Sequence, residues 1–79
     1  MDISEILEIF KSDYPSLDPL EIYDKEGGYL VVAPQHNRQR DPYYVVDITT
    51  RRAYPYIMKS PKEFFEIMNS GPMWAAMND

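Results

Sequence analysis

The order of apolar and polar residues predicts a helix at the start of the chain. The residues at the i, i+3, i+4, i+7 spacing of one helical face are Ile3, Ile6, Leu7 and Phe10. An amphipathic helix is therefore expected near residues 3–13. Asp2 is placed to cap its first turn, and Pro15 ends any continuation because proline lacks the N–H that a helix interior needs.

The next segment has the pattern of a β-hairpin. Residues 20–23 alternate between apolar and polar types, and residues 29–33 are aromatic and β-branched. Between them, residues 24–28 end in two glycines that can adopt positive φ, which favours a tight turn. The polar segment 34–42 that follows is bounded by prolines and is expected to be an exposed loop.

Residues 43–48 carry the strongest strand pattern of the chain. Residues 49–52 then form a turn into a short strand at 53–56. Pro55 cannot donate to a ladder, so this last strand is expected at a sheet edge. Because side chains alternate along a strand, one face should carry Tyr44, Val46 and Ile48 toward the core with Leu30 and Val32, and the other Tyr43 and Val45.

A second helix is expected to begin at Ser60, with Ser60 as N-cap, Pro61 at the first helical position and Glu63 closing a capping box. Its apolar face is formed by Phe64, Phe65, Ile67 and Met68, and Gly71-Pro72 ends it. The predicted fold is α+β, in the order α-β-β-β-β-α, with a small antiparallel sheet of three to four strands. Both helices are expected to cover one face of this sheet.

The length of the chain limits it to one domain, residues 1–79, in which residues 70–79 form a tail that either folds back over the sheet or anchors a partner. There is no cysteine, so neither a disulfide nor a thiolate metal site is expected, and a cytoplasmic location is predicted. No stretch reaches the length of a membrane-spanning segment, and the acidic start lacks the pattern of a secretory signal.

The residue types argue against catalysis, a metal site or a bound cofactor. The single histidine, His36, has no second nitrogen or sulfur ligand near it and no indicated hydroxyl partner. Asp24 and Glu26 are expected at a solvated hairpin tip, and Gly27-Gly28 matches no phosphate-binding motif. The protein is therefore predicted not to be an enzyme.

The charge pattern leaves several binding functions open. The net charge is −5, with acidic residues predominant in 1–34 and basic residues in 35–62. Arginines near tyrosines are typical of a single-strand nucleic-acid groove, but the net charge disfavours that partner. An acidic inhibitor or immunity-type protein is a further alternative. The favoured reading is a protein-interaction module, whose predicted partner-binding residues are Arg51, Arg52, Tyr54, Tyr56 and Trp74.

The run 41–50, Asp-Pro-Tyr-Tyr-Val-Val-Asp-Ile-Thr-Thr, precedes a short strand and a Ser-Pro-x-Glu-Phe-Phe helix. Over about residues 18–69 this arrangement resembles small uncharacterised proteins of bacteria and their phages. Those proteins commonly have Thr-Gly at the turn, where this chain has Thr50-Arg51. The resemblance implies a phage or prophage accessory or virion-associated protein and brings no catalytic residue with it.

Overall fold

The computed structural model describes residues 2–34 and 41–76 of the chain. The elements are α1 (Ile3–Asp13), β1 (Glu21–Lys25), β2 (Gly28–Val32), β3 (Tyr43–Asp47), β4 (Arg52–Pro55), α2 (Pro61–Asn69) and β5 (Trp74–Ala75). All strand pairs are antiparallel, in the order β4-β3-β2-β1-β5. The α+β prediction is confirmed. The sheet has five strands rather than three or four because part of the C-terminal tail forms β5.

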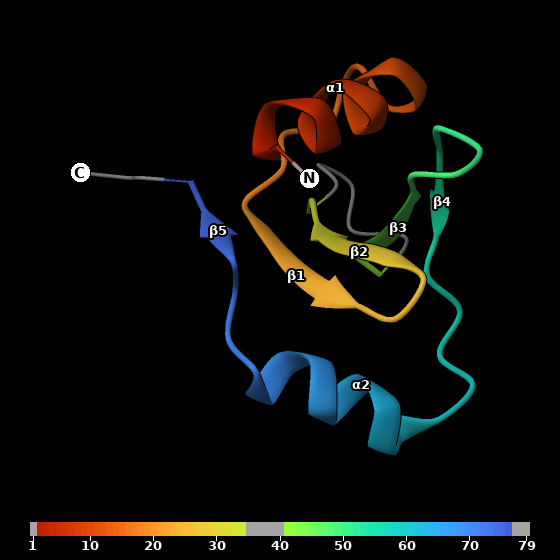
Figure 1. Cartoon of the computed structure of the whole chain (residues 1–79), viewed down its shortest axis with the longest axis vertical. Coiled ribbons are helices and arrows are strands. Elements are labelled where there is room, and N and C mark those ends of the chain that lie inside the picture. The colour runs from red at the N-terminus through yellow and green to blue at the C-terminus, as the bar shows by residue number, and fades with distance from the viewer. Residues whose placement is uncertain (1, 35–40, 77–79) are drawn as a thin grey trace.

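The two helices lie on opposite faces of the sheet, with α1 and α2 at the two ends of the view in Figure 1. The core on the α1 face includes Phe10, Ile22, Val31, Tyr44 and Val46. The core on the α2 face includes Tyr23, Leu30, Val45 and Ile67. The prediction that both helices cover one face is therefore wrong. The central strands β2 and β3 are apolar at successive positions, so both of their faces need a cover.

The register between β2 and β3 corrects a second prediction. Val31 lies opposite Tyr44 and Leu30 opposite Val45. Tyr44 therefore shares its face with Val31 and not with Leu30 or Val32. Alternation along each strand was predicted correctly, but the relative register depends on the long connection between the strands, and a shift of one residue exchanges the faces.

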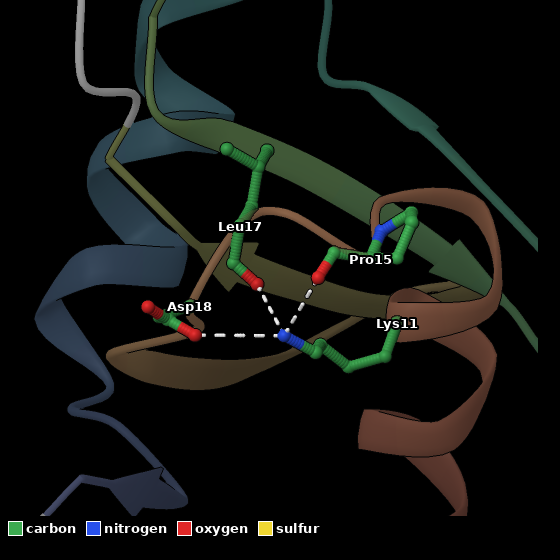
Figure 2. A network of polar contacts seen from close by, with 4 residues as sticks. All are labelled: Lys11, Pro15, Leu17 and Asp18. Carbon is green, nitrogen blue, oxygen red and sulfur yellow. Dashed lines mark hydrogen bonds and ion pairs between the residues drawn. The ribbon is translucent and has the colours of Figure 1, made fainter.

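A lysine side chain holds the segment that leads out of α1. Figure 2 shows Lys11 Nζ directed at two backbone oxygens, Pro15 O at 3.1 Å and Leu17 O at 3.0 Å. The same nitrogen lies 3.5 Å from Asp18 Oδ1. At the other end of the helix, Asp2 Oδ1 accepts the Ser4 N–H at 3.3 Å, as the sequence predicts. A side chain thus caps the start of α1, and a lysine of the helix holds the segment that follows its end.

The predicted start of α2 is confirmed. Ser60 Oγ accepts the Glu63 N–H at 3.4 Å, and Pro61 is the first helical residue. The predicted capping box is only half formed, because the Glu63 carboxylate accepts the Tyr56 hydroxyl at 3.2 Å in place of the Ser60 N–H and so links the helix to the segment before it. Gly71, with φ +81°, follows the last turn, as expected of a glycine stop. Within residues 2–34 and 41–76, neither helix is long and apolar enough to cross a membrane.

The described part of the tail folds back on the sheet. Met73 N–H donates to Ile22 O at 2.8 Å and Ala76 N–H to Leu20 O at 2.7 Å. Trp74 is half-buried against the core on the α1 face. The tail therefore completes the sheet beside β1, in agreement with the first of the two predicted alternatives for it.

Candidate functional site

The edge strand β4 is the element on which the sequence places most of the predicted partner-binding residues. Tyr56 N–H donates to Tyr43 O at 3.0 Å, and this bond shows which residues at the end of β4 direct their backbone groups toward β3. In an antiparallel ladder every second residue bonds to the neighbouring strand. Ala53 and Pro55 therefore direct their backbone groups away from β3, toward the open edge.

Both outward positions of β4 lack a free N–H. The Ala53 N–H is bonded to Asp13 Oδ2 at 2.8 Å, and proline has no N–H. Asp13 belongs to the last turn of α1, so a side chain of this helix occupies the outward N–H of the edge strand β4. The bond to Ala53 and, next, the bond to the Arg52 guanidinium hold the pKa of Asp13 below its usual value of 3.8. Pairing with another strand along β4 is blocked.

The two predicted arginines pair with carboxylates of α1. Arg51 contacts Glu5 at 2.8 Å, and Arg52 contacts Asp13 at 3.1 Å. Arg51 has a positive φ of 56° in the β3–β4 turn, a conformation that L-residues adopt at a cost. Both arginines thus link the start of β4 to α1, away from the tyrosines of the strand.

The two predicted tyrosines lie on the α2 face of the sheet. Tyr54 is opposite Val45 in the ladder and is 46% exposed. Tyr56 is half-buried, with its ring centroid 6.0 Å from that of Phe64 of α2. Burial and, next, the hydrogen bond to Glu63 raise the pKa of Tyr56 above its usual 10.0. Tyr54 is therefore available for contact, whereas Tyr56 belongs mainly to the packing between β4 and α2.

Trp74 lies apart from the other four predicted residues. It belongs to β5, which is at the opposite edge of the sheet from β4. Its cross-strand partner is Ile22 of β1. The prediction placed Trp74 in the surface only if the tail lay near β4, and the tail lies on the far side.

The structure adds two residues that the sequence analysis did not select. Ile57 is 74% exposed and Met58 is 49% exposed, directly after β4. Together with Tyr54, Pro55 and Tyr56 they form residues 54–58, which we call the apolar strip. The sequence signal for Ile57 and Met58 was that residues 54–58, from the end of β4 to the N-cap region of α2, include no polar residue. This segment does not alternate between apolar and polar residues, as a strand with one exposed face would.

A groove of about 270 Å³ runs along the apolar strip. Its apolar walls are Val45, Tyr54, Pro55, Tyr56 and Ile57, and Lys25, Lys59 and Glu63 also line it. A larger hollow of about 800 Å³ lies between the β1–β2 turn and α2, but its lining is mostly charged and polar, with Asp24, Glu26 and Glu66 among the acids. The groove on the strip is the better candidate for binding an apolar group.

The described residues do not assemble a metal site. No group of three or more histidines and carboxylates that could hold a metal ion occurs in residues 2–34 and 41–76. His36, the single histidine, lies outside the described residues, as do Arg38 and Arg40. The candidate site consists of the exposed apolar side chains of the strip and the lysines beside it.

Comparison of the chain with protein-family models, with curated proteins and with solved structures finds no match.

Proposed function

We propose that the protein is a non-enzymatic protein-interaction module that binds its partner through the apolar strip, residues 54–58. The observation that carries this proposal is the exposure of three large apolar side chains, Tyr54, Ile57 and Met58, within five consecutive residues. A small protein needs its apolar residues for its core, and a contiguous exposed group of them is typical of an interface. Tyrosine and methionine are also enriched at such interfaces.

The closed edge of β4 supports contact through side chains rather than by strand addition. With the Ala53 N–H bonded to Asp13 and with proline at position 55, an incoming strand would meet no free backbone donor along β4. A partner would instead pack its own side chains against Tyr54 and Ile57.

The arginine contacts weigh against the two alternative functions. Arg51 and Arg52 are neutralised by Glu5 and Asp13, which reduces the positive charge available to nucleic-acid phosphates. The same pairs occupy two carboxylates that an acidic inhibitor would present. A phage or prophage role and a cytoplasmic location stay predictions.

Capture from a lysate tests the proposal. The full chain carrying a tag is compared with the double variant Tyr54→Ser, Ile57→Ser, and bound proteins are identified by mass spectrometry. Both positions are exposed, so the variant should fold, and circular dichroism checks this. We expect the double variant to lose the main captured protein because the apolar contact area is removed.

Leu20→Ser is the matched control. Leu20 is also an exposed apolar residue, but it lies directly before β1, which two strands separate from β4. The control should retain the captured protein. Identical protein lists from the wild type and the double variant would exclude the apolar strip as the binding surface.

A further inference from the structure

Three lysines near the start of α2 have no ion-pair partner among the described residues. In the described part of the chain, Lys11, Arg51 and Arg52 form ion pairs with carboxylates. Lys25, Lys59 and Lys62 have no carboxylate within ion-pair distance among the described residues. Among the described residues, the lysines and arginines without an ion pair are therefore not on α1 or in the β3–β4 turn but near the apolar strip and the start of α2.

Two of these lysines line the groove itself. Lys25, at the end of β1, and Lys59, just before α2, both line it. The Lys25 ammonium donates to the neighbouring Glu26 O, a bond that leaves its charge uncompensated. Glu63 also lines the groove, but its Oε1 atom is bonded to the Tyr56 hydroxyl. The groove thus combines apolar walls with a net positive lining.

The size of the groove limits what it can hold. A volume of about 270 Å³ is below the range of roughly 300–1,000 Å³ that is usual for sites of drug-sized ligands. It is sufficient for one large apolar side chain. The chain that carries this side chain would lie beside the two lysines that line the groove.

We infer that the groove takes a short acidic peptide segment of a partner protein, which inserts one aromatic or long aliphatic side chain against Tyr54 and Ile57 while its carboxylates lie near Lys25 and Lys59. This inference rests on the proposed function and adds the chemistry of the partner. Charge complementarity at the rim selects the partner and aligns it, and the apolar anchor supplies most of the affinity.

Two other occupants fit the surface less well. A nucleic acid would use several exposed rings for stacking, and in the groove only Tyr54 of the tyrosines is well exposed. A second copy of this chain that docks through the same groove would bring its own Lys25 and Lys59 to the contact, because a two-fold interface pairs a surface with itself, and like charges would meet.

A displayed library of random short peptides, selected on the immobilised full chain, tests the inference. We expect the enriched peptides to share one large apolar residue with aspartate or glutamate on both sides. A synthetic peptide of the enriched sequence should shift the amide signals of Tyr54 and of residues 56–59 in the spectrum of the ¹⁵N-labelled chain. Replacing its apolar residue by alanine should abolish these shifts.

Charge-reversal variants locate the acidic contact. For the enriched peptide, Lys59→Glu should weaken binding by about tenfold, because an attraction at the rim becomes a repulsion. Lys62→Glu is the matched control, since Lys62 has the same change of charge on the same part of the chain but does not line this groove. It should weaken binding by about twofold or less, because its charge lies outside the lining of the groove and is partly screened by salt.

Several results would overturn the inference. These are enrichment of neutral or basic peptides, no enrichment at all, equal effects of the two lysine variants, and shifts at Tyr54 and residues 56–59 caused by protein concentration alone or by a single-stranded oligonucleotide. The proposed function is tested separately, because loss of a captured protein in the Tyr54→Ser, Ile57→Ser variant does not depend on the charge of the bound segment.

Discussion

Gly28 opens β2 at a place where a side chain has no room, and the substitution Gly28→Ala tests this contact. A Cβ atom at Gly28 would lie 2.5 Å from the carbonyl oxygen of Val46 in β3 and 3.5 Å from its carbonyl carbon. Both atoms belong to the backbone of a central strand, which cannot rotate away as a side chain can. One of the two strands must therefore move.

Whether Gly28→Ala lowers or raises the free energy of unfolding distinguishes the steric contact with Val46 from the effect of alanine on the entropy of the unfolded chain. The φ of Gly28 is not positive, so alanine can adopt its conformation. Without a clash, Gly28→Ala would stabilise the fold by about 0.4–1 kcal/mol through the unfolded state. The steric contact should cost about 1–3 kcal/mol, as overpacking does. Most of this range is larger than the gain from the unfolded state. We expect a net loss of about 1–2 kcal/mol in the free energy of unfolding.

Urea denaturation followed by circular dichroism measures the change. With a slope of about 1 kcal/mol per molar for a small domain, the midpoint should fall by about 1–2 M. Gly27→Ala is the comparison: its Cβ would meet nothing within 4 Å, but its φ of +84° is unfavourable for alanine. Gly27→Asn should recover part of that loss, since asparagine tolerates positive φ, whereas Gly28→Asn should be worse than Gly28→Ala. A higher midpoint for Gly28→Ala would refute the close approach of the strands.

Three further predictions concern the helix ends. Ser60→Ala should lower the free energy of unfolding by about 1 kcal/mol, and an unchanged denaturant midpoint would mean that the cap contributes nothing. Lys11→Met keeps the aliphatic stem but removes the donors to two carbonyls, so amides in residues 14–18 should exchange hydrogen faster, while those of β3 stay protected. The pKa of Asp13 is lowered in the folded state, so the folded state binds fewer protons than the unfolded state. The stabilising contribution of the Asp13 carboxylate is present above pH 3.8 and is lost as the pH falls through the lowered pKa. In the variant Asp13→Asn, the free energy of unfolding should therefore fall less steeply as the pH is lowered through this window. Denaturation series at several pH values measure this dependence. The same dependence on pH in the variant and the wild type would argue against the bond to the Ala53 N–H.

Local signals in the sequence were sufficient for the elements but not for their arrangement. The cap at Ser60 and the glycine turn at Gly27 depend on neighbouring residues, and both are found where the sequence places them. The distribution of α1 and α2 over the two faces depends on which apolar residues of β2 and β3 share a side. Successive apolar positions carry no information about that choice.

The candidate surface was predicted in part for a similar reason. Tyr54 was identified from residue type and its position on an edge strand, and its exposure agrees with that reasoning. Arg51 and Arg52 were selected by the same argument, but their partners Glu5 and Asp13 are distant in sequence and could not be inferred from it. Trp74 was assigned without knowledge of which edge the tail joins.

The return of the tail to β1 has a consequence for how the molecule opens. The strands β1 to β4 are neighbours in both sequence and space, whereas β5 pairs with β1 across all the strands between them and α2, with Glu21 opposite Ala75. Closing the longer loop costs more entropy and is repaid by only two residue pairs. Detachment of β5 together with α2 is therefore one partial unfolding that breaks few strand pairs, and it would expose Tyr23 and Leu30 while the other face of the sheet stays covered by α1.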